Sequence, residues 1–196
     1  MFDEELILEN KIVKLRLLKS DDFDDFLQIS NESSIWEYFT SDLIYEENIK
    51  MWIDEALGQY KMKSRYPFTI IDKVLHRTAG STSYGNISRR DKRIEIGWTW
   101  LGKKFQGSGI NKHCKFLLLQ YAFEVLDFER VEFKTDVLNL QARKALEKIG
   151  AVEEGVLRSH TLMPHNRRRD TIFYSILKNE WQELKKSVFK DIVVGY

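Results

Sequence analysis

The sequence predicts an α/β fold of the α+β type, in which a mixed β-sheet is flanked by helices. In its central stretch, an alternating strand, a glycine-rich loop and a long apolar helix follow one another from Glu95 through Asn111. That helix crosses over to the next strand, so the two strands should be parallel, whereas short turns make the other strand pairs antiparallel. The length favours one domain over residues 1–196.

The composition is that of a chain with a sizeable core. Of the 196 residues, 43% are hydrophobic and 13% aromatic, and the two prolines and ten glycines leave no room for long linkers. No stretch is apolar enough to span a bilayer, and Met1–Glu5 lacks the basic start of a signal peptide. The single cysteine, Cys114, excludes an internal disulfide framework. We therefore expect a cytoplasmic protein without membrane contact.

Charge is unevenly distributed along the chain. Residues 1–60 contain 5 Lys/Arg and 15 Asp/Glu, whereas residues 61–196 contain 26 and 15, for a net charge of +1. A basic region around the glycine loop suits a polyanionic ligand, and an acidic first third suits a cationic one. Each charge run can also be the solvated face of a helix.

The first half of the chain should supply three strands and two helices. Short β-prone runs predict strands at Lys11–Leu18, Pro67–Lys73 and Thr78–Ile87. Apolar residues at helical spacing predict a helix around Phe23–Leu27 and a longer one from Glu46 to Tyr60, with a helical turn at Glu32–Tyr38. The polar segment Ser88–Arg93 then forms a hairpin connection to the next strand, the alternating run from Ile94 to Trp100, which is called the key strand below.

The key strand and the helix after it carry the strongest patterns. Apolar Ile94, Ile96, Trp98 and Trp100 alternate with Glu95, Gly97 and Thr99, which predicts that the four apolar side chains share one face. The helix from Ile110 is apolar nearly all round, so it should pack deeply against the sheet. Cys114 lies in its apolar stripe, which favours a packing role over a nucleophilic one.

The last third continues with a strand, a helix and a hairpin. The run Arg130–Thr135 reads as the strand parallel to the key strand, and Asn139 and Gly150 fit the two ends of the next helix. A hairpin from Glu153 to Leu177 and a helix from about Asn179 close the chain. The tip of this hairpin carries Arg167–Arg169, which can be a solvated turn or a contact for nucleic-acid phosphates.

The glycine loop has the chemistry of an anion site but not the spacing of two common ones. Gly102 and Gly107 have P-loop spacing, but Ser108 stands where the lysine is required. Gly107 and Gly109 begin a dinucleotide fingerprint, but Lys112 stands at the third glycine. A glycine-rich turn that binds nothing is the remaining alternative.

The segment Gln106-Gly-Ser-Gly109-Ile-Asn111 resembles the Gln/Arg-x-x-Gly-x-Gly/Ala loop of GNAT acetyltransferases, although Asn111 departs from the usual small residue. Asn139-x-x-Ala142 and a helix ending Leu146-Glu-Lys-Ile-Gly150 follow in the order that this superfamily has. From Arg93 to Trp181 the chain resembles the branch that acetylates ribosomal protein N-termini. The resemblance implies a splayed sheet with a GNAT-like acyl-CoA N-acyltransferase fold.

The resemblance also implies a set of binding residues for acetyl-CoA as cosubstrate, with no metal. Backbone groups in the key strand should pair with the pantetheine arm, those in the loop should hold the pyrophosphate, and Asn139 should lie near the thioester. In chain order these residues are Trp98, Thr99, Trp100, Leu101, Gln106, Gly107, Ser108, Gly109, Ile110, Asn111 and Asn139. Lys103, Lys104 and Arg143 are further candidates for phosphate contacts.

The implied chemistry is direct attack of an amine on the thioester in a ternary complex. Glu95 is the candidate base, with a charge on the exposed strand face as its alternative; Tyr84 and His160 are weaker candidates. In relatives, a Tyr at the position of Leu146 or a Ser at the position of Ala142 often acts as the general acid. Leu146 and Ala142 of this chain cannot donate a proton. The proton donor is therefore unassigned by the sequence.

We expect an N-acetyltransferase acting on a primary amine, such as a protein N-terminus, a polyamine or another cationic small amine. The main alternative to an enzyme is a non-catalytic acyl-CoA sensor or interaction protein with the same fold. A second alternative is a nucleic-acid-binding module that uses Arg167–Arg169. We expect no direct nucleic-acid binding, and the sequence leaves a homodimer open.

Overall fold

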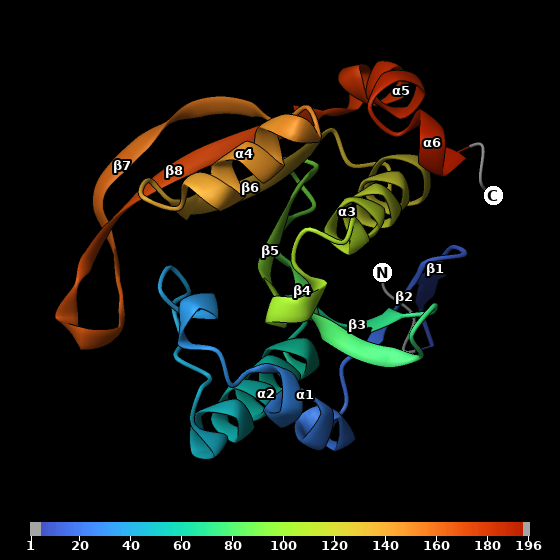
Figure 1. Ribbon diagram of the computed structural model, residues 1–196. Coiled ribbons are helices and arrows are strands. Elements are labelled where there is room, and N and C mark those ends of the chain that lie inside the picture. The colour runs from blue at the N-terminus through green and yellow to red at the C-terminus, as the bar shows by residue number, and fades with distance from the viewer. Residues whose placement is uncertain (1–4, 194–196) are drawn as a thin grey trace.

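The computed structural model describes residues 5–193 and shows one eight-stranded mixed sheet with helices on both faces (Figure 1). The strand order is β1-β2-β3-β4-β5-β6-β8-β7. The strands are β1 (Ile7–Glu9), β2 (Val13–Leu17), β3 (Arg65–Asp72), β4 (Arg77–Ser88), β5 (Arg93–Leu101), β6 (Arg130–Asp136), β7 (Val152–Leu162) and β8 (Arg168–Leu177). The helices are α1 (Phe23–Ile29), α2 (Glu46–Lys61), α3 (Ile110–Gln120), α4 (Leu140–Lys148), α5 (Lys178–Ser187) and α6 (Lys190–Val193).

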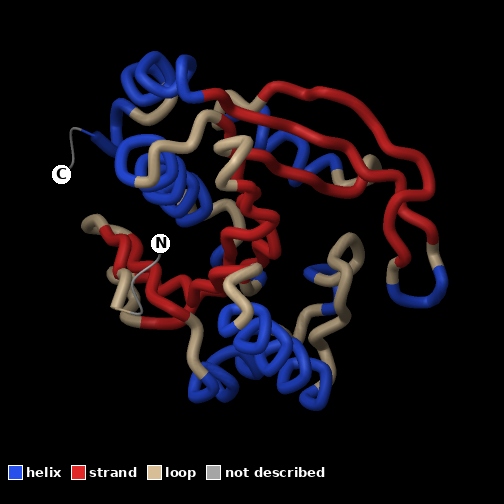
Figure 2. Tube along the Cα trace, turned by 180° about the vertical axis from the view of Figure 1, so that it is seen from behind, coloured by secondary structure: helices blue, strands red, loops and turns tan. Residues whose placement is uncertain are grey.

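The mixed sheet confirms the predicted fold class. The pair β5–β6 is parallel and the other neighbouring strands are antiparallel, as expected from the helix that crosses over between β5 and β6. Figure 2 shows the same arrangement from behind, with the β7–β8 hairpin extending away from the rest of the sheet. The short edge strand β1 and the last helix α6 were not predicted, because three or four residues carry too little periodicity to be recognised.

Each face of the sheet has its own aromatic core. On one face, Trp100 of β5 packs edge-on against Phe26 of α1 and Trp52 of α2, with ring centroids 5.0 Å and 6.4 Å away. On the other face, α3 lies along the sheet, and the Tyr84 hydroxyl donates to the Leu118 carbonyl. The predicted deep packing of α3 is confirmed, since its residues from Cys114 to Leu119 are all buried.

Local end signals place α4. The Asn139 side chain accepts a hydrogen bond from the Ala142 N–H at 2.9 Å, which satisfies one of the first free amides of the helix. Gly150 follows the helix with φ +86°, the left-handed conformation expected of its C-terminal glycine. Both ends of α4 were predicted from the sequence and are confirmed.

Replacing Gly150 with alanine should destabilise the fold by about 1–2 kcal/mol, because a left-handed conformation is costly for a residue with a Cβ. The added Cβ would also lie 2.3 Å from a methyl group of Leu184. Gly58→Ala in α2 is the matched control, because its Cβ would meet no atom within 4 Å and should stabilise the helix by about 0.5–1 kcal/mol. Urea unfolding measures both changes, and equal stabilities of the two variants would contradict this expectation.

Candidate active site

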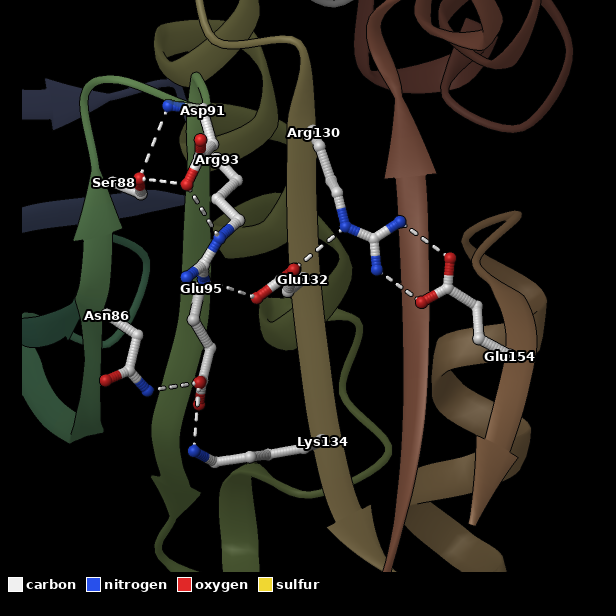
Figure 3. Close-up of polar contacts among 9 residues, drawn as sticks. All are labelled: Asn86, Ser88, Asp91, Arg93, Glu95, Arg130, Glu132, Lys134 and Glu154. Atoms are coloured by element: carbon white, nitrogen blue, oxygen red, sulfur yellow. Dashed lines mark hydrogen bonds and ion pairs between the residues drawn. The ribbon is translucent and has the colours of Figure 1, made fainter. Parts of the chain in front are cut away.

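A cleft of about 750 Å³ opens where β5 and β6 separate. The two strands pair only from Arg93 and Arg130 to Glu95 and Glu132, and no pairing follows beyond Glu95. On the paired side of this point, Arg93, Glu132, Arg130 and Glu154 form a row of ion pairs across the sheet (Figure 3). The row links β5, β6 and β7 at the closed end, and the strands diverge toward the open end.

A β-bulge in β5 lies at the start of this divergence. Ser81 pairs with Trp100 and Ser83 pairs with Gly97, so Trp98 and Thr99 together face the single residue Thr82. Trp98 has φ +50°, an unusual value for a residue with a bulky side chain. A bulge bends and twists its strand, which agrees with the loss of pairing to β6.

The bulge changes which side chains share a face of β5. The Trp98 ring lies over Gly85, which is paired with Glu95, and Trp100 packs on the α1–α2 face. Thr99 instead contacts Lys115 of α3. The prediction that Ile94, Ile96, Trp98 and Trp100 share one face is therefore wrong for the two tryptophans, because the extra residue shifts the alternation by one.

Two cations hold the ring of Trp98. The Arg65 guanidinium carbon lies 4.7 Å from the ring centroid, and Lys134 Nζ lies 5.9 Å from it. Arg65 also stacks on Trp52 of α2 at 4.8 Å and donates from Nε to Ser83 Oγ at 2.8 Å. Burial of this guanidinium lowers the pKa of Arg65 to about 9. These contacts fix the bulge on the α1–α2 side of the sheet.

The glycine loop lies between the end of β5 and the start of α3. Gly107 and Gly109 have φ values of +75° and +91°, and a Cβ at either would meet nothing within 4 Å, so the surface above them is open. Within residues 5–193, the N–H groups of Gly107, Ser108 and Gly109 enter no hydrogen bond with a backbone or side-chain acceptor. Free amides at a helix N-terminus fit a phosphate group.

The loop residues Gln106 and Asn111 line the cleft. Gln106 Nε2 donates to the Leu101 carbonyl at 3.2 Å, which ties the loop to the end of β5. Asn111 Oδ1 is buried without a hydrogen-bond partner, which is costly unless a ligand or water supplies a donor. The loop therefore has both an open rim of amides and an unsatisfied polar atom toward the cleft.

Most of the predicted binding residues meet at this cleft. Its lining includes Trp98, Thr99, Trp100, Leu101, Gln106, Asn111 and Asn139. Gly107, Ser108 and Gly109 lie at the exposed rim of the loop, and the Ile110 side chain is buried beneath the start of α3. The structure thus brings together segments of β5, α3 and α4 that are up to about forty residues apart in the sequence.

Glu95 lies on the wall of the cleft at the last β5–β6 pair. It is 4% exposed, and its Oε2 accepts a hydrogen bond from Asn86 Nδ2 at 2.6 Å and forms an ion pair with Lys134 Nζ at 3.0 Å (Figure 3). The alternative interpretation, a carboxylate on the exposed face of the strand, is wrong. Lys134 contacts both Glu95 and the Trp98 ring, so Glu95 faces the α1–α2 side.

The other candidate proton-transfer groups lie elsewhere. Tyr84 is fully buried, and burial raises the pKa of its hydroxyl well above the usual value. His160 lies on the exposed strand β7, with Nδ1 3.1 Å from Thr171 Oγ1. Neither residue lines the cleft.

The additional phosphate candidates differ in position. Lys103 lines the cleft, and Lys104 is exposed beside the loop with Nζ 4.8 Å from the Phe105 ring centroid. Arg143 donates to the Tyr174 hydroxyl at 3.2 Å and to the Val137 carbonyl at 3.2 Å, so its guanidinium is engaged within the fold.

The three arginines of the β7–β8 tip differ in exposure: Arg168 is exposed, Arg167 is half-buried and Arg169 is buried. Arg167 pairs with the buried carboxylate of Asp136 at 2.5 Å, and Arg168 donates to Ser159. Arg169 is 5% exposed and lines the cleft. The interpretation of these residues as a solvated tip is therefore wrong for Arg169.

Lys115 is a cleft residue that the sequence analysis missed. Its Nζ donates to Thr99 Oγ1 at 2.8 Å, and burial lowers the pKa of its ammonium group to about 8. A charged residue inside the run Cys114–Leu119, which is otherwise apolar, was the signal available in the sequence. Its significance depends on burial beside β5, which only the structure reveals.

The comparisons with known proteins agree with this geometry. A family model described as "Acetyltransferase (GNAT) domain" matches residues 13–152. A crystal structure of a putative acetyltransferase from T. thermophilus superposes with a TM-score of 0.88 at 33% identity, covering 97% of this chain and 99% of that one. A GCN5-related N-acetyltransferase from Brucella melitensis superposes with a TM-score of 0.87 at 27% identity, covering 96% and 86%. The chain belongs to the GNAT family of N-acetyltransferases, as the motifs indicated.

One curated relative carries a more specific name. The "Putative ribosomal N-acetyltransferase YdaF" of Bacillus subtilis (strain 168) is 37% identical over 103 residues, which cover 53% of this chain and 55% of that protein. The match thus spans little more than half of the relative.

Within the described range 5–193, no three His, Cys, Asp or Glu side chains gather as a metal site would require. None of the helices in that range is long and apolar enough to cross a membrane.

Cys114 should be unreactive in the native protein, because burial raises the pKa of its thiol to about 12 and leaves almost no thiolate at pH 8. A chromogenic disulfide reagent should therefore label the folded chain far more slowly than the chain unfolded in guanidinium. Cys114→Ala should retain transferase activity. Rapid labelling of the folded protein at pH 8 would contradict the packing role.

Proposed function

We propose that this chain transfers the acetyl group of acetyl-CoA directly to a primary amine in a ternary complex. The observation that carries the proposal is the continuous cleft that joins the glycine loop to the divergence of β5 and β6. The name of the relative YdaF makes a protein N-terminus, such as that of a ribosomal protein, the first acceptor to test. Polyamines and other cationic small amines are the remaining candidates, and residues 1–196 would act as one domain.

The donor would be held mainly from the α3 side. The amides of Gly107, Ser108 and Gly109 and the start of α3 are suited to the pyrophosphate. Beyond Glu95, the β6-facing edge of β5 has no partner strand, so the backbone groups of Trp98–Leu101 are available to an extended pantetheine arm. Asn139 lines the cleft, and its side-chain oxygen already caps α4, which leaves its amide donors for the ligand.

The acceptor would approach from the α1–α2 side. Glu95, Lys134 and Arg169 line the cleft together with the loop residues Tyr38 and Phe39. This wall carries one acidic side chain, Glu95, and two basic ones, Lys134 and Arg169, so it favours a strongly cationic acceptor less than the acidic first third of the sequence suggested. A polar acceptor with one amine near Glu95 suits this wall better than a polyamine does.

The chemistry needs a neutral amine and stabilisation of the charge that develops on the carbonyl oxygen. Glu95 would accept the proton of the amine, directly or through a water. A backbone N–H of the bulged part of β5 would stabilise the oxyanion. A covalent enzyme intermediate is not required, and the buried thiol of Cys114 is unsuited to forming one.

Calorimetry with coenzyme A and acetyl-CoA tests the donor half of the proposal, because the cleft should bind both with one-to-one stoichiometry. Release of free thiol should then occur with acetyl-CoA and one member of a panel of N-terminal peptides, polyamines and small amines. Absence of binding would overturn the proposal. Binding without turnover on any amine would favour the acyl-CoA sensor.

Glu95→Gln should lower kcat by about 10²-fold or more while leaving the affinity for acetyl-CoA nearly unchanged, because general-base catalysis typically contributes 10²–10⁴-fold. The amide keeps an oxygen that can accept from Asn86 and Lys134 but cannot take up a proton. Glu132→Gln, on the neighbouring strand and outside the cleft lining, is the matched control. Steady-state kinetics and calorimetry on both variants decide the point, and an unchanged kcat in Glu95→Gln would exclude the proposed base.

A further inference from the structure

Lys115 occupies an unusual position for a lysine. It lies one turn into α3, four residues after Asn111, and is 5% exposed. Its Nζ is 2.8 Å from Thr99 Oγ1 and 5.9 Å from the ring centroid of Phe133 on β6. The side chain therefore bridges the point at which β5 and β6 diverge, and it lines the cleft.

The described part of the chain provides no counterion for this ammonium group. Among the ion pairs of residues 5–193, none with a nitrogen–oxygen distance up to 4.0 Å involves Lys115. Its neighbours are the hydroxyl of Thr99, which is itself hydrogen-bonded to Thr82, the ring of Phe133 and the thiol of Cys114 on its own helix. A buried cation without a carboxylate is costly. A purely structural role would be served equally well by an apolar residue.

Lys115 and Glu95 lie on opposite faces of the split sheet. Lys115 reaches the split from α3, whereas Glu95 is on the face of Trp98, Arg65 and α2. An amine that enters on the Glu95 side would leave the sulfur of the thioester toward the α3 side, where the glycine loop also lies. The structure thus separates one group suited to accept a proton from one suited to donate a proton.

Helix α4 contributes no acid to the cleft. Ala142 and Leu146 both line the cleft, and neither side chain has a proton to give. Thus, of the cleft-lining groups near the divergence on the α3 side, the ammonium of Lys115 is the one with a readily transferable proton.

We propose that Lys115 is the general acid of this enzyme and protonates the sulfur of coenzyme A as the thioester breaks. The proposal rests on the proposed acetyl transfer. The amine nitrogen forms the new C–N bond, and the C–S bond breaks with its electron pair moving onto sulfur. Lys115 Nζ gives a proton to that sulfur and becomes a neutral amine, which water reprotonates. The proton released by the new amide nitrogen passes to Glu95 or water.

The energetics of this transfer are nearly balanced. Burial lowers the pKa of Lys115 to about 8, and an ordinary thiol has a pKa of about 8.5. A donor and an acceptor with similar pKa values exchange a proton without a large thermodynamic barrier, whereas an ordinary lysine with a pKa of about 10.4 would be a weaker acid. The position of Lys115 and its acidity therefore agree.

Lys115→Met tests the proposal, because methionine fills much of the same volume without charge or proton. The expected result is a kcat lowered by about 10²–10⁴-fold with acetyl-CoA affinity within a few-fold of the wild type. The fall of the wild-type kcat above about pH 8, where Lys115 loses its proton, should be absent from the variant. Lys148→Met, at an exposed site on α4, is the control for the substitution itself.

A second measurement does not depend on turnover. The ultraviolet absorbance of the thiolate reports ionisation of bound coenzyme A, with desulfo-coenzyme A as the blank. The positive charge of Lys115 should favour the thiolate, so the bound thiol should ionise at a lower pH in the wild type than in Lys115→Met. Urea unfolding confirms that each variant is folded.

The outcomes separate the two proposals. A wild-type chain that binds no acetyl-CoA would contradict the proposed function itself. An active wild type with equal kcat and equal thiol ionisation in Lys115→Met would overturn the role of Lys115 alone. A variant that loses only acetyl-CoA affinity, with kcat unchanged, would likewise overturn the general-acid role.

Discussion

The loss of pairing between β5 and β6 after Glu95 is the constraint on which the rest of the site depends. Parallel strands that continue side by side leave no room for a ligand, and the bulge at Trp98 and Thr99 bends β5 away from its neighbour. The separation opens the cleft, exposes a strand edge inside the sheet, and places the end of β5 beside the glycine loop. The binding site is therefore formed mainly by the course of the backbone, that is, by the separation of β5 and β6 and the free edge of β5.

The strained conformation of Trp98 is maintained by its surroundings. A positive φ at a bulky residue costs on the order of 1–3 kcal/mol and persists only where packing over-determines it. Arg65 and Lys134 contact the ring, and Gly85 leaves space for it. Two residues further along β5, Trp100 packs into the aromatic core of α1 and α2 and so anchors the strand. These elements support the site from the α1–α2 side of the sheet.

Placing titratable groups on the two faces of a split sheet has a chemical consequence. Glu95 and Lys115 do not form an ion pair with each other. Glu95 pairs with Lys134, and Lys115 has no carboxylate partner within 4.0 Å among the described residues. The buried, unpaired lysine therefore remains a stronger acid than usual. This arrangement offers a way for acetyl transfer to proceed although Ala142 and Leu146 of α4 supply no proton to the cleft.

The order of the main elements, the glycine loop and the two ends of α4 could be predicted from the sequence, because periodicity, positive-φ glycines and capping are local properties of a few neighbouring residues. The face of Trp98, the burial of Glu95 and Arg169, and the position of Lys115 beside Thr99 depend on the folded arrangement. A one-residue bulge is set by pairing with β4, and burial of a charge is set by elements far away in the chain. Neither leaves a periodic signal in the residues concerned.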